Sequence, residues 1–116
     1  MSVAKPPLTP VSVIGAGCAG LSLAARAAEL PNQRISLIAP HGEMSADHIW
    51  GFWAMPWLRA ATLTARTQWT QWRIISADQN ILHQSDTHPY CAIHRHRWLQ
   101  ECEKKARANG VPFEQE

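Results

Sequence analysis

Residues 11–20 of the chain read VSVIGAGCAG and contain the pattern G-x-G-x-x-G at Gly15, Gly17 and Gly20. Three of the first four residues are apolar and β-branched, and they predict a short buried parallel strand that leads into the turn. We expect Gly15 to allow the tight turn, Gly17 to let backbone N–H groups approach a pyrophosphate, and Gly20 to let the next helix pack on the strand. Ala16 lies in the same turn. The stretch predicts a dinucleotide-binding turn, although glycine-rich turns that bind nothing share its pattern.

The residues after the turn supply the structural context that the pattern needs. Residues 19–30 predict a helix that ends at Pro31, and residues 35–38 predict a second short strand. The inner face of this helix is made of small side chains apart from one leucine: Leu21, Ala24, Ala25 and Ala28. Strand, helix and strand form a βαβ unit, so the expected fold class is α/β, with a Rossmann-like dinucleotide-binding fold.

The position that normally contacts the ribose of a dinucleotide is altered. An Asp or Glu is expected about 20 residues after the glycine turn, at the end of the second strand. This chain has Ala39 there, nineteen residues after Gly20, and alanine cannot accept a hydrogen bond from a hydroxyl. Glu43 in the following loop, or a water molecule, are the two substitutes that the sequence offers. The absence of a basic residue beside Ala39 gives no support for a 2′-phosphate site.

The rest of the chain has weaker patterns. Three prolines in residues 1–10 indicate a flexible leader, and residues 11–116 are expected to form the N-terminal part of a dinucleotide-binding domain. Residues 41–58 are interpreted as a loop with one helical turn at most. The remaining expected elements are a helix over 58–66, strands over 69–75 and 81–83 with a turn at 77–80, a strand over 90–93, a helix over 96–109 that ends at Gly110, and a strand over 111–113.

Composition excludes several classes of protein. A net charge of +2 over 116 residues is too small, and too evenly spread, for a nucleic-acid-binding protein. Three cysteines, an odd number, do not indicate a disulfide scaffold. The most apolar window, residues 11–30, contains Arg26 and Glu29 and predicts no membrane-spanning helix. The prolines before it also argue against a signal peptide.

A metal site is not expected either. Cys91, His94 and His96 lie close together, and the two histidines would share one face of a strand. No second pair of ligands follows at a familiar spacing, and Arg95 and Arg97, the neighbours of His96, would repel a cation.

Three segments resemble known flavoproteins. Residues 47–53, DHIWGFW, resemble the His-Thr-Trp-Ser-Phe motif of the bacterial lycopene cyclase family, with Ile49 in place of Thr and Gly51 in place of Ser. Residues 68–74, QWTQWRI, resemble a Trp-containing strand of the same family. Residues 93–111, which include Arg95, resemble the strand-to-helix passage of that family and of many FAD monooxygenases and reductases. The likeness extends over residues 11–116.

This resemblance implies a glutathione-reductase-type FAD-binding fold, incomplete within the chain because it covers the N-terminal third of such a protein. It implies FAD as cofactor, NAD(P)H as the reductant of the flavin, and lycopene as an apolar polyene substrate. The parent reaction is the cyclisation of lycopene ends to β-ionone rings without net redox change. The family implies a bacterial cytoplasmic protein with peripheral association at the inner membrane surface. The FAD contacts expected are Gly15, Ala16, Gly17, Gly20, Ala39, His48, Trp50 and Arg95.

Two other interpretations fit the sequence. The chain is alternatively a fragment of an FAD-dependent monooxygenase or isoprenoid reductase, or a truncated vestige without function. No catalytic residue is assigned within residues 1–116, because the acidic motif of the cyclases falls outside them. We expect the isolated chain to be inactive and to bind little FAD.

Six tryptophans are unusual for a chain of this length, and three of them recur at helical spacing. Trp50, Trp53 and Trp57 would form a stripe if that segment were helical. Such a stripe would serve as an apolar wall beside a flavin or polyene, or would simply pack on the sheet.

Overall fold

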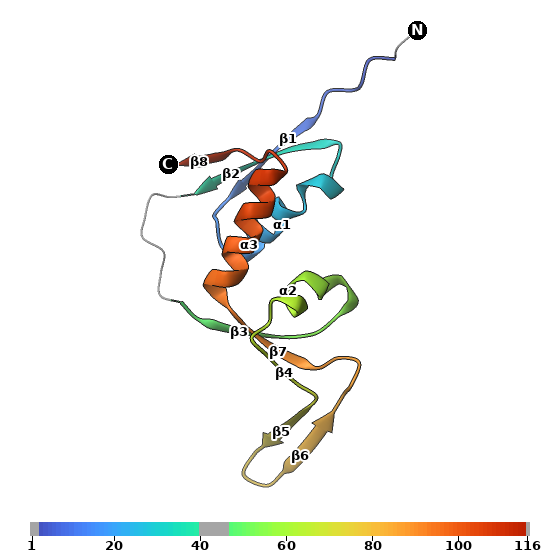
Figure 1. Cartoon of the computed structure of the whole chain (residues 1–116), viewed down its shortest axis with the longest axis vertical. Coiled ribbons are helices and arrows are strands. Elements are labelled where there is room, and N and C mark those ends of the chain that lie inside the picture. Colours follow the sequence, from blue (N-terminus) through green and yellow to red (C-terminus); the bar gives the residue numbers. More distant parts are fainter. Residues whose placement is uncertain (1–2, 40–46, 116) are drawn as a thin grey trace. The chain divides into compact units, whose positions relative to one another are not determined.

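The computed structural model describes residues 3–39 and 47–115, which divide into two compact units (Figure 1). Of the described residues, one unit consists of 3–39 and 99–115, and the other of 47–98. The glycine-rich turn belongs to the first unit, and the segment that resembles the cyclase motif belongs to the second.

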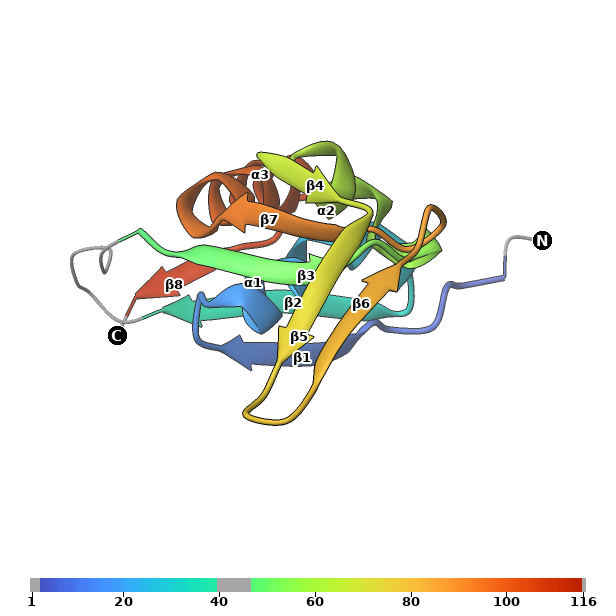
Figure 2. The ribbon, with the colours of Figure 1, turned by 90° about the horizontal axis from the view of Figure 1, so that it is seen from below.

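A three-stranded parallel sheet forms the basis of the first unit. Its strands lie side by side in the order β1 (Thr9–Ile14), β2 (Gln33–Ala39) and β8 (Phe113–Gln115) (Figure 2). Helix α1 (Cys18–Ala25) connects β1 to β2, which confirms the predicted βαβ unit. Helix α3 (Arg95–Ala108) begins in the second unit and continues into the first.

Strand β1 begins two residues earlier than the predicted strand and includes Thr9 and Pro10. These two residues were expected in the leader. Proline cannot donate a ladder hydrogen bond, but β1 is an outer strand of this sheet, where a missing donor is tolerated. The Thr9 backbone N–H is satisfied by the carbonyl of Asn32 at 3.0 Å.

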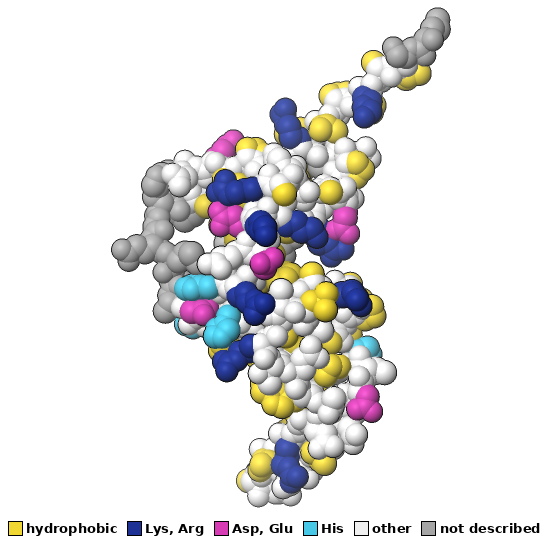
Figure 3. Space-filling model, in the orientation of Figure 1, with side chains coloured by type: hydrophobic (Ala, Val, Ile, Leu, Met, Phe, Trp, Pro, Cys, Tyr) yellow, Lys and Arg dark blue, Asp and Glu magenta, His cyan; other side chains and the backbone are white. Residues whose placement is uncertain are grey.

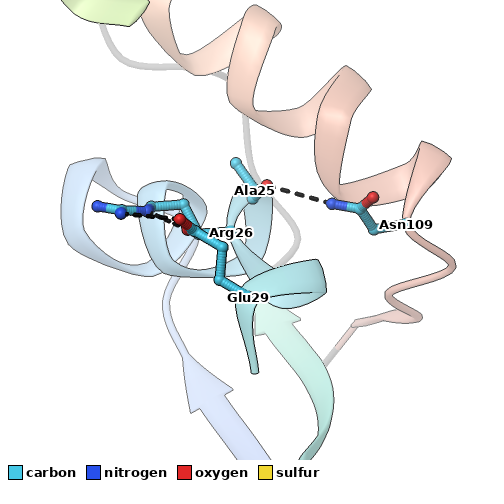
Figure 4. Close-up of polar contacts among 4 residues, drawn as sticks. All are labelled: Ala25, Arg26, Glu29 and Asn109. Carbon is cyan, nitrogen blue, oxygen red and sulfur yellow. Dashed lines mark hydrogen bonds and ion pairs between the residues drawn. The ribbon is translucent and has the colours of Figure 1, made fainter. Parts of the chain in front are cut away.

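Helix α1 is shorter than predicted, because its last turn tightens into a 3₁₀ turn at Ala27–Glu29. The Ala25 carbonyl accepts a hydrogen bond from the Asn109 side chain at 3.2 Å, in place of the backbone N–H that a longer helix would provide (Figure 4). The Arg26 guanidinium binds the Glu29 carboxylate across the turn, with Nη2 3.0 Å from Oε1. Ala28 therefore leaves the helical face and is exposed.

The core of the first unit lies between one face of the sheet and the two helices. The predicted inner face of α1 is confirmed apart from Ala28. The buried residues are Leu21, Ala24 and Ala25 on α1, Ile35 and Leu37 on β2, and Leu99, Cys102 and Ala106 on α3, with Val111.

Gly110 ends helix α3, as its position predicted. Its φ of +78° is the left-handed conformation that glycine adopts without strain. The Gly110 N–H donates to Arg107 at 3.0 Å, and the Val111 N–H donates to Ala106 at 3.1 Å. These two bonds form a Schellman motif, which satisfies carbonyls at the end of the helix.

The second unit contains an antiparallel sheet and a separate hairpin. The sheet order is β3 (Ile49–Trp53), β7 (Tyr90–His94) and β4 (Thr67–Trp69). Helix α2 (Arg59–Leu63) follows a 3₁₀ turn at Pro56–Leu58. Strands β5 (Gln71–Ile75) and β6 (Asn80–Gln84) form the hairpin, as predicted for two strands joined by a turn. The predicted continuous strand over 69–75 is wrong at its start, because the strand is interrupted at Thr70 and Trp69 belongs to β4.

The interpretation of residues 41–58 as a loop is wrong for residues 49–53, which form β3. The helical tryptophan stripe is wrong for the same reason. Trp50 and Trp53 are three positions apart on a strand, so their side chains point to opposite faces of the sheet. Trp57 lies in the 3₁₀ turn and is 69% exposed. The part of the segment at residues 41–46 lies outside the described residues.

Within the described residues, no helix has both the length and the apolar character needed to cross a membrane.

Candidate functional site

The glycine turn is built on the conformation of its first glycine. Gly15 has a φ of +103°, in the region that favours glycine, and it turns the chain from β1 into α1. Its backbone N–H donates to the Ile38 carbonyl at 2.7 Å, so the turn is fixed beside the end of β2. The predicted role of Gly15 in the tight turn is confirmed.

Gly20 is required by packing. A Cβ atom at this position would lie 2.1 Å from the Gly15 carbonyl oxygen and 3.2 Å from Cγ1 of Val13. The first of these contacts is far inside van der Waals distance, and its partner is a backbone atom. Gly20 therefore allows helix α1 to pack against the turn and strand, as predicted.

Gly17 is not required by the protein itself. Its φ of −84° and ψ of −164° are extended values that any residue adopts, and an added Cβ would meet no atom within 4 Å. Gly17 is the N-cap of α1, where no side chain caps the helix and no acidic residue lies in the first turn. The turn thus presents uncapped amides of a helix N-terminus on an open side, which is the geometry of an anion site.

Ala39 and Ala16 complete the predicted group in the first unit. Ala39 is the last residue of β2 and is partly exposed, as is Ala16. The structure brings the end of β2 beside the turn through the bond between Gly15 and Ile38. The proposed substitute for the ribose carboxylate, Glu43, lies outside the described residues.

The three predicted residues of the second unit, His48, Trp50 and Arg95, also lie close together. The Arg95 backbone N–H donates to the His48 carbonyl at 2.8 Å, and the Arg95 guanidinium carbon lies 5.8 Å from the centre of the Trp50 ring. Nη1 of Arg95 is buried and has no hydrogen-bond partner within residues 3–39 and 47–115. A buried donor without a partner is costly, so this atom is suited to a ligand that accepts a hydrogen bond.

Asp47 is a structural residue that sequence reasoning missed. Its Oδ1 accepts from the His96 backbone N–H and its Oδ2 lies against Nδ1 of His94, both at 3.0 Å. With the His48 carbonyl, it satisfies amides at the N-terminus of α3 from a segment far away in the chain. These contacts, that of the His96 N–H above all, hold the pKa of the Asp47 carboxyl below its usual range.

The sequence from residue 10 to residue 116 matches the family model described as lycopene cyclase protein. The chain belongs to the lycopene cyclase family. A search of curated protein sequences finds no match.

Several solved structures share the fold of this lycopene cyclase family member. 2-Methyl-3-hydroxypyridine-5-carboxylic acid oxygenase has a TM-score of 0.68 and 19% identity, over 93% of this chain and 31% of the oxygenase. CtdE in complex with FAD and a substrate has a TM-score of 0.65 and 15% identity, over 92% of this chain and 30% of CtdE. The peptidyl tryptophan dihydroxylase QhpG has a TM-score of 0.57 and 16% identity, over 95% of this chain and 25% of QhpG. The chain spans less than a third of the length of these proteins.

The metal interpretation of the cysteine and histidine cluster receives no support from the family member's structure. Strand β7 ends at His94 and His96 lies in helix α3, so the two histidines do not share the face of a strand that such a site would need. Cys91 is fully buried, and its Sγ contacts the Pro89 carbonyl. Among the described residues, no group of three or more His, Cys, Asp or Glu is placed to hold a metal ion.

Gly51, which stands where the family motif has serine, has a local packing reason. A Cβ at Gly51 would lie 1.8 Å from the Tyr90 hydroxyl and 2.5 Å from its Cζ. The Tyr90 ring also packs edge-on against Trp53 at 5.1 Å and stacks with Trp69 at 6.2 Å. An aromatic ring that covers a cross-strand glycine compensates for the missing side chain.

We expect Gly51→Ser, which restores the family hydroxyl, to lower the free energy of unfolding by about 1–3 kcal/mol through overpacking. The Tyr90 ring contacts Trp53 and Trp69, so moving it away from the serine would disturb both contacts. Urea unfolding of Gly51→Ser, Tyr90→Ala and the double variant measures the coupling. The cost of the serine should shrink markedly in the Tyr90→Ala background. Strictly additive effects would contradict this packing.

The lowered pKa of Asp47 predicts that the chain loses part of its folding stability in acid. Because its pKa is lowered in the folded state, its contribution is complete above the ordinary pKa of about 3.9 and is lost as the pH falls through the lowered folded value. Asp47→Asn keeps an oxygen that can cap α3 but does not titrate. Urea midpoints measured from about pH 5 to pH 2 should fall less steeply for Asp47→Asn than for the native chain. Equal slopes would show that Asp47 is not the titrating group.

Proposed function

We propose that the chain forms the part of a lycopene-cyclase-type flavoprotein that binds the adenosine diphosphate moiety of FAD. One observation carries the proposal: Gly17 is glycine although neither its backbone angles nor its packing requires it. A ligand that approaches the turn closely explains this choice, since a Cβ would stand in its way. The helix N-terminus behind Gly17 favours a negatively charged ligand, as in a pyrophosphate.

Each unit, considered by itself, contains residues that fit this cofactor. Gly17 leaves an open cradle for phosphates in the first unit, and in the second Arg95 keeps a buried donor without a described partner. Arg95 is therefore proposed to donate a hydrogen bond to FAD, while the Trp50 ring and the His48 carbonyl position its side chain and backbone. CtdE, which shares the fold, was solved with FAD, and this supports the choice of dinucleotide.

The family suggests the reaction that such a site serves. In a lycopene cyclase, bound reduced FAD supplies electrostatic stabilisation of positive charge that develops on the polyene. We propose NAD(P)H as the reductant and lycopene as the substrate. The described residues bind and orient the cofactor in this account, and none is assigned as catalytic.

A membrane-associated location follows from the proposed substrate, because a C40 hydrocarbon resides in a bilayer. We propose the cytoplasmic face of the bacterial inner membrane. Exposed apolar side chains on the hairpin support contact with an apolar phase (Figure 3): Ile74, Ile75, Ile81 and Leu82, each at least 44% exposed.

An FAD-dependent oxygenase is the second candidate. The observation that favours it is the fold shared with 2-methyl-3-hydroxypyridine-5-carboxylic acid oxygenase and with QhpG. These identities are below 20%, whereas the cyclase family model matches residues 10–116. We therefore place the cyclase first.

A chimera distinguishes the two candidates. Residues 10–116 replace the corresponding segment of an active lycopene cyclase, and the chimera is expressed in lycopene-accumulating bacteria. We expect loss of the red lycopene colour, cyclised carotenoids by chromatography, and FAD in the purified protein. The same chimera with Gly17→Asp is the matched control and should lack FAD. A soluble, FAD-containing chimera that leaves lycopene uncyclised would contradict the cyclase and favour an oxygenase.

A further inference from the structure

The position beside Ala39 on the next strand suggests how the missing ribose carboxylate is replaced. In the parallel pairing of β2 and β8, Ala39 lies opposite Gln115. We propose that the Gln115 side-chain oxygen accepts the hydrogen bond from the ribose 2′-hydroxyl of the bound nucleotide. The inference rests on the proposed function, since it assumes that the glycine turn holds the phosphates of the same nucleotide.

The register of the sheet determines the face on which Gln115 lies. Side chains alternate along a strand, so Phe113 and Gln115 share one face and Glu114 takes the other. Phe113 lies opposite the fully buried Leu37, and its ring is 4.0 Å from the guanidinium carbon of Arg107 on α3. The shared face is therefore the one covered by the helices, which is also the face of Ala39.

The three chain segments meet at the carboxyl edge of the parallel sheet. The Gly15 turn follows β1, its N–H binds the Ile38 carbonyl at the end of β2, and Gln115 is the last residue of β8. Nucleotides bind in open α/β sheets at this edge. A nucleotide whose phosphates lie on the turn brings its ribose to the ends of β2 and β8.

The chemistry of the side chain suits the missing group. Adjacent strands are about 4.8 Å apart, and the glutamine side chain is long enough to reach across from β8 to the place that a carboxylate on β2 would occupy. Its amide oxygen accepts a hydrogen bond, as a carboxylate does, but carries no charge. Gln115 is exposed, so the side chain is accessible to a ligand.

Titration with ADP and with 2′-deoxy-ADP tests the assignment on the full chain. Backbone amide resonances of residues 15–20, followed by NMR, give the dissociation constants. Gln115→Ala should weaken ADP binding about three- to tenfold, the value of one hydrogen bond, and should leave 2′-deoxy-ADP binding unchanged. Glu114→Ala, on the opposite face, is the matched control and should change neither.

A second variant keeps the outcome informative. Ala39→Asp combined with Gln115→Ala restores an acceptor on β2 and should recover the ADP affinity. If Gln115→Ala binds ADP as tightly as the native chain does, the assignment of Gln115 is overturned while the proposed function stands. If the native chain fails to bind ADP at all, the proposed function is overturned, and this inference with it.

Discussion

The Gly17→Asp variant is expected to lose nucleotide binding while its fold becomes slightly more stable. Aspartate is a favoured N-cap residue, and helix α1 has no side-chain cap of its own. An added Cβ at Gly17 meets no atom within 4 Å, so the substitution costs no packing. Capping and the charge at the helix N-terminus together should raise the free energy of unfolding by about 0.5–1 kcal/mol.

The same carboxylate occupies the amides and places a negative charge where the phosphates would bind. Repulsion between like charges at such short range costs several kcal/mol, so we expect a loss of affinity for ADP of about 100-fold or more. Gly17→Asn is the matched control: it offers a similar cap without the charge and should weaken binding less. Undiminished ADP binding by Gly17→Asp would show that phosphates do not lie on this turn.

Gly20→Ala is expected to destabilise the chain by about 1–3 kcal/mol, the range for overpacking. In an unconstrained helix the same change stabilises by about 1 kcal/mol, so the sign of the effect is itself informative. The cause is the Gly15 carbonyl oxygen, which would lie 2.1 Å from the new Cβ and belongs to the backbone of the turn. Urea unfolding followed by tryptophan fluorescence measures the difference.

The matched control makes the same chemical change three residues earlier. Gly17→Ala adds its Cβ to open space and should alter the free energy of unfolding by less than about 1 kcal/mol. Because Gly20→Ala displaces the turn, we also expect it to weaken ADP binding. Equal stability of the two variants would contradict the close packing of α1 on the turn.

Sequence reasoning succeeded where the structure depends on neighbouring residues. The strand, glycine turn and helix at residues 11–25 follow from local conformational preference, and so does the end of α3 at Gly110. The predicted end of α1 was wrong because it depends on a residue from a distant segment. The Asn109 side chain donates a hydrogen bond to the Ala25 carbonyl, where α1 ends.

Long-range pairing explains the other errors. Strand β3 forms because Trp50 and its neighbours pair with β7, about forty residues later in the chain. The spacing of the tryptophans also fits a helix, and this misled the prediction. The contacts of Asp47 were missed for a similar reason, since its partners His94 and His96 lie 47 and 49 residues later in the chain. The family motif did single out Trp50 and Arg95, but their contact and the buried Nη1 required the structure.

The central claim is that the turn at residues 15–20 holds the phosphates of a dinucleotide. An NMR titration of the native chain and of Gly17→Asp with ADP tests it most directly, because weak binding is still detected residue by residue. We expect saturable shifts of the amide resonances of residues 15–20 in the native chain and their loss in the variant. Shifts confined to other residues, or the same response in both chains, would contradict it.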